Sequence, residues 1–444
     1  MLFKKQNAFY AAIAIALFTV AAYVYVDHRH EESRIPNISK RSGDLGAASE
    51  ILNLQKAVEF YRTEIRLNPD LIKNYVELAQ LYIQEARVTG RHHEYVAHAD
   101  QLLDEALRRS PDNAEAAMTK AGLLLTMHRF EEAKKLAEFA VKRNAYSAFA
   151  WGALCDAEKE LGNYSAAVRA CDKMLSLRPD LRSYSRAAHL REIHGDLPAA
   201  RAAMKLACDA GVTGQENRAW ALYQFANLFL KEGKIDTAEF IYKGLLEERS
   251  NYPYALAGLA DVHSARGQFN EAIQLLLRAY DLTPEHTFME KLVDVYRATG
   301  QTRKSEILAE SVLEAFKQHE EQGWNVNLEY ALFCANHDLQ LGEALRRIEQ
   351  EIKIRPDNID VQEAHAWVLY KLGRADDAMA AIEKPLQMNT ANAMLLCRAG
   401  MIAKKMGDFD KAKNYIEAAL KINPYLSLSE IQLAKRVLNG INPS

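Results

Sequence analysis

The chain has 444 residues, of which 49% are hydrophobic and 26% are charged, and this balance excludes a largely disordered protein. Its 56 basic and 59 acidic residues leave a net charge of −3, which gives no support for nucleic acid as a partner. The 5 cysteines form no CxxC pair and no Cys/His spacing typical of zinc, so neither a disulfide framework nor a structural metal is expected.

An apolar segment lies close to the N-terminus. Residues 8–26 carry no charge and would span roughly 28 Å as a helix, about the thickness of a bilayer's hydrocarbon core. They predict a transmembrane signal anchor that contacts the lipid bilayer, after a short basic tail at residues 1–7. A cleaved signal peptide is the alternative, and it is disfavoured because the apolar run continues past the candidate cleavage alanines to Val26.

The charges around this segment predict its orientation. Lys4 and Lys5 precede it, and a short basic tail before a first apolar segment favours a cytoplasmic N-terminus. Residues 27–43 are polar and are expected to form a tether between the membrane and the rest of the chain. We therefore expect the remainder of the chain outside the cytoplasm.

A seven-residue motif recurs through the rest of the chain. The copies are MHRFEEA at 127–133, LGNYSAA at 161–167, RGQFNEA at 266–272, LGRADDA at 372–378 and MGDFDKA at 406–412. The final alanines of neighbouring copies lie 34 residues apart, as from Ala133 to Ala167 and from Ala378 to Ala412. Glycine permits a turn with positive φ, and a small final residue lets two helices approach closely. The motif therefore predicts helix pairs, each with a tight turn and a crowded crossing.

This period and these residues resemble the tetratricopeptide repeat (TPR) family. The residues that match the family's positions in one unit are Trp151, Leu154, Gly162, Tyr164, Ala167 and Pro179. The resemblance implies an all-α fold, a right-handed superhelical solenoid of stacked antiparallel helix pairs. The apolar segment adds the expectation of one N-terminal transmembrane helix before it. Residues 44–426 would hold about eleven units, the first degenerate, and residues 427–444 a capping helix and tail.

Other segments, such as QEARVTG and NVNLEYALF, are similar to a widespread group of bacterial tetratricopeptide proteins without an established activity. This resemblance implies a bacterial origin and a dedicated scaffold. With the anchor, it predicts a single-pass protein of the bacterial inner membrane whose repeat region lies in the periplasm.

The sequence shows no sign of catalysis. It contains no phosphate-binding, dinucleotide-binding, zinc-protease or nucleophile-elbow motif, so we expect no enzyme activity, no metal and no small-molecule cofactor. Tetratricopeptide proteins that bind acidic tails use a clamp of lysine and asparagine residues. Asn227 and Lys231 resemble one turn of such a clamp, but Asp261 and Asp294 occupy the neighbouring units, so the clamp is not assembled.

One position in each first helix is expected to face the concave surface. In chain order its occupants are Gln80, Gly122, Asp156, His189, Asn227, Asp261, Asp294, Phe333, Trp367 and Met401. We expect a basic part of a partner along the acidic middle, and an apolar anchor of the partner at Phe333, Trp367 and Met401. Tyr370 would widen that apolar end. The alternative is that Trp367 only fills space between units.

These features predict a membrane-anchored scaffold that binds a protein or peptide partner in its concave groove, for the assembly of an envelope complex. The alternative is a non-catalytic regulatory subunit of a membrane enzyme in glycan, lipopolysaccharide or lipoprotein assembly. Cys155 and Cys171 fall on the two helices of one unit. They are predicted either to pair in an oxidising compartment or to remain two buried thiols.

Overall fold

The computed structural model describes residues 19, 35–43, 45–426, 434 and 436–438, and within these ranges all regular structure is helical. The first helix whose bounds the structure describes is α2 (Ala48–Leu67), and ten helix pairs follow it. The first helices of the pairs are α3 (Ile72–Thr89), α5 (Ala114–Thr126), α7 (Ala148–Glu160), α9 (Leu181–Ile193), α11 (Glu216–Lys231), α13 (Pro253–Ala265), α15 (His286–Ala298), α17 (Asn327–His337), α19 (Ile359–Lys371) and α21 (Ala393–Lys405). The second helices are α4 (His92–Arg109), α6 (Phe130–Arg143), α8 (Tyr164–Leu177), α10 (Leu197–Ala210), α12 (Ile235–Glu248), α14 (Phe269–Leu282), α16 (Thr302–Glu321), α18 (Leu341–Ile354), α20 (Ala375–Gln387) and α22 (Phe409–Ile422).

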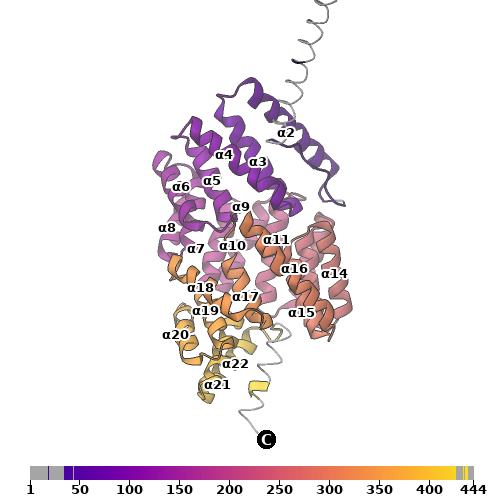
Figure 1. The fold of residues 1–444 in the computed structure, drawn as a ribbon, viewed down its shortest axis with the longest axis vertical. Helices are drawn as coiled ribbons and strands as arrows, with labels where there is room; N and C mark the ends of the chain where they lie inside the picture. Colours follow the sequence, from indigo (N-terminus) through magenta and orange to yellow (C-terminus); the bar gives the residue numbers. More distant parts are fainter. Residues whose placement is uncertain (1–18, 20–34, 44, 427–433, 435, 439–444) are drawn as a thin grey trace, which may run out of the picture.

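The predicted all-α fold of stacked helix pairs is confirmed for this part of the chain (Figure 1). The predicted anchor at residues 8–26 lies outside the described residues apart from Thr19. The tail at 1–7, the tether up to residue 34 and most of 427–444 also lie outside them. Of the helices that are described, none is both long enough and apolar enough to cross a membrane.

The pair α7–α8 shows how the repeated motif produces a helix pair. The Ser147 hydroxyl accepts a hydrogen bond from the backbone N–H of Ala150 and caps the start of α7. Gly162 takes φ +83° between the helices, a conformation that costs other residues about 1–2 kcal/mol. Ala167 is fully buried where α8 crosses α7, which confirms the packing role predicted for the motif's last residue.

The same small position is buried along the whole array. It is occupied by Ala99, Ala133, Ala167, Ala200, Ala238, Ala272, Ser305, Ala344, Ala378 and Ala412. Cys155 and Cys171 pack in the same crossing region of α7–α8, and both thiols are buried and free. The hydrogen bond with Cys171, together with burial, raises the pKa of Cys155. The disulfide that the sequence left open is therefore not formed in this structure.

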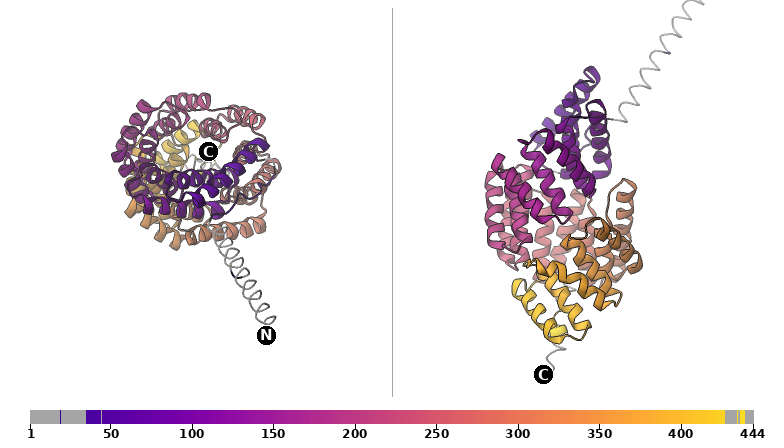
Figure 2. Two further views of the ribbon diagram at one scale, coloured as in Figure 1. Left: turned by 90° about the horizontal axis from the view of Figure 1, so that it is seen from above. Right: turned by 90° about the vertical axis from the view of Figure 1, so that its left-hand side faces the viewer.

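Successive pairs stack with a steady rotation, so the helices form a ring when viewed along the long axis (Figure 2). First helices of neighbouring pairs contact one another in most of the array, for example α5 with α7 and α17 with α19. No two second helices make a comparable contact among the described residues. The first helices therefore line the inner side of the curve, and the second helices form its outer side.

The array is long enough to wind past its own start. Helices α2–α12 form the first turn of the superhelix, and α13–α22 form the second turn (Figure 1). Segments of the two turns touch although they are close to 200 residues apart in sequence, as Arg249 does with Glu50. These contacts define the candidate site as much as the inner face does.

Candidate functional site

The residues predicted to face a partner all lie on first helices, which is the inner side of the superhelix. Asp156 is on α7, Asp261 on α13 and Asp294 on α15. Asn227 and Lys231 are on α11. The apolar set lies further along, with Phe333 on α17, Trp367 and Tyr370 on α19, and Met401 on α21. Their side chains nevertheless make contacts that the sequence did not predict.

The acidic inner residues are tied to cations of the next unit. Asp156 accepts hydrogen bonds from the Arg186 guanidinium, with a shortest N–O distance of 2.6 Å. Asp261 accepts from the Lys291 ammonium at 2.8 Å. Burial opposes the charge of Lys291, but the carboxylate of Asp261 outweighs it and raises the pKa of Lys291. Both carboxylates therefore join units, which reduces the negative charge available to a partner.

Asp294 is the most exposed of the predicted acidic residues. Its side chain is 54% exposed, and one carboxylate oxygen lies 3.6 Å from Nε2 of His337. Burial of His337, followed by the positive charges of Arg297 and Lys371, lowers its pKa to about 4. The ring is therefore neutral at pH 7.

The pair that resembled a clamp is engaged within the chain. The Lys231 ammonium lies 2.5 Å from a carboxylate oxygen of Glu192, on the preceding first helix. The Asn227 amide oxygen accepts a hydrogen bond from the Tyr242 hydroxyl at 2.5 Å. Both side chains therefore have a partner within the chain, although Lys231 is 62% exposed.

The predicted apolar end of the groove needs correction. Phe333 is 2% exposed, Trp367 is 3% exposed and Met401 is 1% exposed, so the expectation of an exposed anchor site is wrong. The Trp367 indole N–H donates to the Asn336 amide oxygen at 2.9 Å, and its ring stacks on Tyr370 with centroids 5.0 Å apart. Large side chains at this position turn into the space between neighbouring first helices. The structure thus matches the alternative in which Trp367 fills space between units.

Other inner residues remain available to a partner, and sequence reasoning missed them. Phe149, Arg182 and Asp360 are each the second residue of a first helix. All three are solvent-exposed, and neither Arg182 nor Asp360 forms an ion pair with any described residue. The missed signal was this second position, because residues near the start of the first helix also face inward.

These three residues form two sites of opposite character. The Arg182 guanidinium lies 4.6 Å from the centroid of the Phe149 ring. Burial, and then the charges of Arg186 and other nearby arginines, lowers the pKa of Arg182. Asp360 and Arg182 are reached by solvent but are surrounded by protein on the inner side of the curve, and this partial desolvation, with the neighbouring carboxylate of Glu160, raises the pKa of Asp360. The inner face therefore offers a cationic and aromatic site near α9, and an anionic site at the start of α19.

A set of hydrogen bonds and ion pairs between residues almost 200 apart in sequence joins the two turns of the superhelix. The side-chain amide of Asn358 donates to the backbone carbonyl of Glu160 at 2.9 Å, and the backbone N–H of Ile359 donates to the Tyr164 hydroxyl at 2.9 Å. Arg355 lies 3.4 Å from the Glu160 carboxylate. The loop before α19 is thereby fixed to the turn between α7 and α8. We call this set of contacts between turns the seam.

The seam repeats the same relationship in other units. The turn between α5 and α6 accepts a hydrogen bond at the Met127 carbonyl from the backbone N–H of Asn325, at 3.0 Å. The turn between α11 and α12 accepts one at the Leu230 carbonyl from the side chain of Asn423, at 3.2 Å. In the first turn of the superhelix, the connections within helix pairs therefore bind loops that lie before or after helix pairs of the second superhelical turn.

Among the described residues, two arginine–glutamate ion pairs and two histidine–glutamate contacts cross the seam. They are Arg249 with Glu50 at 2.9 Å, His92 with Glu285 at 3.7 Å, His128 with Glu329 at 3.4 Å, and Arg355 with Glu160 at 3.4 Å. Burial alone would raise the pKa of each glutamate, but neighbouring cations outweigh it and lower the pKa of all four. The seam is therefore closed by charge as well as by hydrogen bonds.

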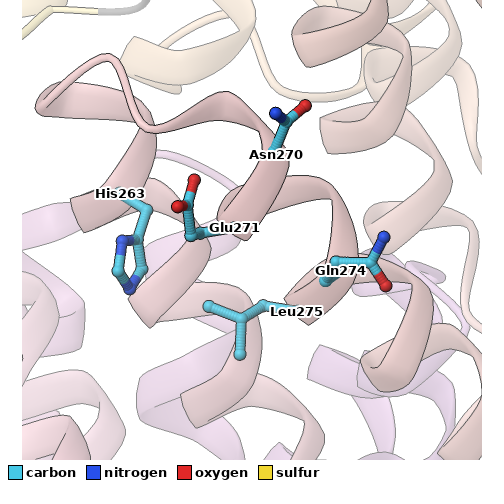
Figure 3. A pocket seen from close by; sticks show the side chains of 5 residues that line it. All are labelled: His263, Asn270, Glu271, Gln274 and Leu275. Atoms are coloured by element: carbon cyan, nitrogen blue, oxygen red, sulfur yellow. The ribbon is translucent and has the colours of Figure 1, made fainter.

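Two hollows open on the surface of the second turn. One has a volume of about 480 Å³ and is lined by His263 of α13 and by four residues of α14 that Figure 3 shows as sticks. The other has a volume of about 540 Å³ and is lined by residues 300–304 and Ile307. Both lie beside the turn between the two helices of a pair. No three His, Cys, Asp or Glu side chains in the described ranges are placed to hold a metal ion.

Comparison with known proteins identifies the repeats. Two family models described as tetratricopeptide repeat match residues 229–287 and 395–426. The chain is 27% identical over 280 residues to cellulose synthase 1 operon protein C of Komagataeibacter xylinus, covering 60% of this chain and 20% of that protein. It is 38% identical over 81 residues to tetratricopeptide repeat protein 33 of Mus musculus, covering 18% of this chain and 31% of that protein. The chain thus spans only about a fifth of the length of the first of these relatives.

Solved structures with similar helix arrangements include the human IFIT1 dimer with PPP-AAAA. That similarity has a TM-score of 0.45 and 15% sequence identity, and covers 84% of this chain and 90% of that chain. A thermophilic tetratricopeptide protein of Thermus thermophilus gives a TM-score of 0.37 at 20% identity, covering 44% of this chain and 97% of that chain.

Proposed function

The chain is a tetratricopeptide-repeat protein, and from this premise we propose that it is a scaffold that binds a protein or peptide partner on the inner face of its superhelix. The observation that carries the proposal is the continuous inner face formed by the first helices of ten stacked pairs. Extended concave surfaces of this kind are the usual binding surfaces of repeat proteins. Such repeats generally act as non-catalytic scaffolds.

The inner-face residues with exposed side chains suggest the chemistry of the partner segment. Arg182 and Phe149 suit an acidic or aromatic part of the partner, because arginine and aromatic side chains are enriched where binding energy concentrates. Asp360 and Asp294 suit a basic part. A segment of mixed charge therefore fits this face better than the basic-and-apolar segment expected from the sequence.

We also propose that residues 8–26 anchor the protein in the bacterial inner membrane, with the repeats in the periplasm. The uncharged run and the lysines before it support this placement. An anchored scaffold would serve the assembly of an envelope complex. Protease added to spheroplasts should then degrade the repeat region, whereas full protection by an intact membrane would contradict the orientation.

A non-catalytic regulatory subunit of a membrane enzyme is the second candidate. The similarity to part of cellulose synthase 1 operon protein C favours an enzyme of glycan assembly over one of lipopolysaccharide or lipoprotein assembly. The two candidates differ in what the partner does. Deleting the chain should change the partner enzyme's turnover if the chain is a regulatory subunit, and only the partner's recovery in the complex if it is a scaffold.

Site-specific photocrosslinking in intact cells tests the inner-face assignment. A photoreactive residue at Arg182 or at Asp360 should crosslink to the same partner protein. The matched control is Phe240 on α12, which is 79% exposed on the outer side of the superhelix and should give no such product. A partner captured from Phe240 and from neither inner position would overturn the proposal.

A further inference from the structure

At the seam, loops of the second superhelical turn pack closely against glycines that connect the two helices of a pair. A Cβ added at Gly162 would lie 2.4 Å from the carbonyl carbon of Asp357, and one added at Gly195 would lie 2.3 Å from the carbonyl oxygen of Asn389. Both glycines belong to the first turn of the superhelix. Their backbones are therefore in close contact with loops of the second turn.

In the second turn of the superhelix, the short connections between the two helices of a pair are not covered by any described segment. A Cβ added at Gly267, Gly300, Gly373 or Gly407 would meet no described atom within 4 Å. These turns lie between α13 and α14, α15 and α16, α19 and α20, and α21 and α22. Each of these four glycines occupies the same position in its helix pair as Gly162 and Gly195, which are covered, do in theirs.

The residue that starts the second helix shows the same difference. At the seam, Phe130 is 5% exposed and Tyr164 is 9% exposed. Phe409 starts α22 and is 51% exposed. The two hollows, beside Leu275 and beside Ile307, lie along the same set of open turns. We call this set, from the α13–α14 turn to the α21–α22 turn, the open edge.

Loops of the kind that would fill the open edge exist elsewhere in the chain. Residues 355–358, RPDN, form the seam loop, and residues 110–113, SPDN, form an almost identical loop between α4 and α5. The Asn113 amide oxygen caps α5, as Asn358 caps α19. The side chain of Asp112 is 71% exposed, and no second-turn segment lies over this loop among the described residues.

The open edge and the uncovered loops belong to opposite ends of the molecule. All pairs have the same orientation in the stack, so the turns within pairs face one end of the long axis and the loops between pairs face the other (Figures 1 and 2). Asp112 of the uncovered loop pairs with Arg143, as Asp357 of the seam loop pairs with Lys384, so the two loops also share their local ion pair. One molecule therefore carries, at opposite ends, an open edge and a set of uncovered loops of the kinds that contact each other at the seam.

We propose that the open edge binds the first-turn loops of a second copy of this chain, so that copies associate head to tail along the superhelix axis. The contact would reproduce, between molecules, the seam that each molecule already makes within itself. Because the two contacting surfaces differ, the association is heterologous and can continue beyond a dimer. It uses loops and turns rather than the inner face, so it is independent of partner binding in the groove.

Sedimentation velocity of the full chain in detergent tests the proposal. Between about 1 µM and about 100 µM, the average mass of the wild type should rise with concentration. Phe409→Glu places a charge on the open edge, and Asp112→Trp blocks the SPDN loop, so each should weaken self-association by about 30-fold or more. Phe240→Glu is the control, because Phe240 is exposed on the outer side and away from both surfaces.

A mixture of the two variant proteins tests whether the open edge binds the loops directly. A Phe409→Glu molecule keeps its loops, and an Asp112→Trp molecule keeps its open edge, so an equimolar mixture should form dimers that do not grow further. Circular dichroism should show wild-type helicity for both variants, and Phe409→Ser replaces Phe409→Glu if helicity is lost. A wild type that stays monomeric throughout, a mixture that does not dimerise, or an equal loss with Phe240→Glu would overturn the proposal.

Discussion

The side chain of Asn358 joins two segments that are 198 residues apart. Its Nδ2 donates a hydrogen bond to the backbone carbonyl of Glu160 at 2.9 Å. Its Oδ1 accepts hydrogen bonds from the backbone N–H groups of Asp360 and Val361 and caps α19. One side chain therefore both starts a helix and fixes the second turn of the superhelix to the first.

Replacing Asn358 by alanine should remove both interactions. We expect a loss of about 1 kcal/mol for the cap and about 1 kcal/mol more for the hydrogen bond across the seam. Asn392→Ala is the matched control, because Asn392 caps α21 through Met394 and Leu395, and its side chain forms no hydrogen bond across the seam with any described residue. Urea unfolding and hydrogen exchange in α7 should report the difference. Equal losses for the two variants would contradict the role of Asn358 in the seam.

Gly162→Ala and Gly373→Ala separate backbone strain from the seam itself. Gly162 has φ +83° and Gly373 has φ +80°, so both variants should lose about 1–2 kcal/mol from the left-handed conformation. Only at Gly162 would the new methyl group also collide with the backbone of Asp357. Gly162→Ala should therefore be the more destabilising of the two in thermal and urea unfolding. If Gly373→Ala proves as costly, the close approach at Gly162 contributes nothing.

The helix pairs could be predicted from the sequence because their determinants are local. Ala167 and Gly162 lie only five residues apart, and the crossing and the turn that they permit involve the two helices that they join. The seam could not be predicted in this way. It depends on the small rotation between pairs, added over six units before Asn358 meets Glu160, and no spacing in the sequence encodes that rotation.

The sequence correctly placed the inner-face residues on first helices, but it did not predict what their side chains contact. Asp156 and Asp261 do lie on first helices, yet their partners Arg186 and Lys291 are on the next first helix, thirty residues further on. A search for opposite charges at that separation would have found both pairs. Trp367 was harder, because the direction of a large side chain between two helices depends on the packing of its neighbours.

Trp367→Ala should act mainly on stability. The indole is 3% exposed, donates to Asn336 at 2.9 Å, and lies 5.0 Å from the Arg398 guanidinium, so its loss leaves a large cavity. We expect a loss of about 3–5 kcal/mol in unfolding free energy. Phe240→Ala, at a site that is 79% exposed, should change stability by less than about 0.5 kcal/mol. A Trp367→Ala protein with a wild-type melting temperature and lost partner binding would restore the anchor role.

A group of histidines at the seam should make stability depend on pH. His319 on α16 stacks on Trp324 with ring centroids 5.1 Å apart, and His286 lies 5.3 Å from it on α15. Burial, together with the charges of His286, His92 and His128, outweighs the carboxylate of Glu285 and lowers the pKa of His319 to about 4. An unfolded chain would bind this proton near pH 6.5.

The sign follows from this difference between the folded and unfolded states. Between pH 6.5 and about 4 the unfolded chain binds a proton at His319 that the folded chain does not, so stability falls as pH falls through this window. The pKa values of Glu285 and Glu329 are lowered from 4.5, so their contributions are lost only at lower pH. The pKa of His128 is raised, so its contribution is present below pH 6.5 and is lost as pH rises through the raised value.

The variant His319→Gln measures how much of the pH dependence of the unfolding free energy comes from His319. From pH 7 to pH 5 the wild type should lose about 1–2 kcal/mol more unfolding free energy than the variant, after allowance for the partial exposure of the ring. The other titrating groups are common to both proteins, so their effects cancel in the comparison to a first approximation. Urea unfolding at several pH values measures the slope, and an unchanged slope in His319→Gln would show that His319 is already protonated, or solvated, in the folded chain.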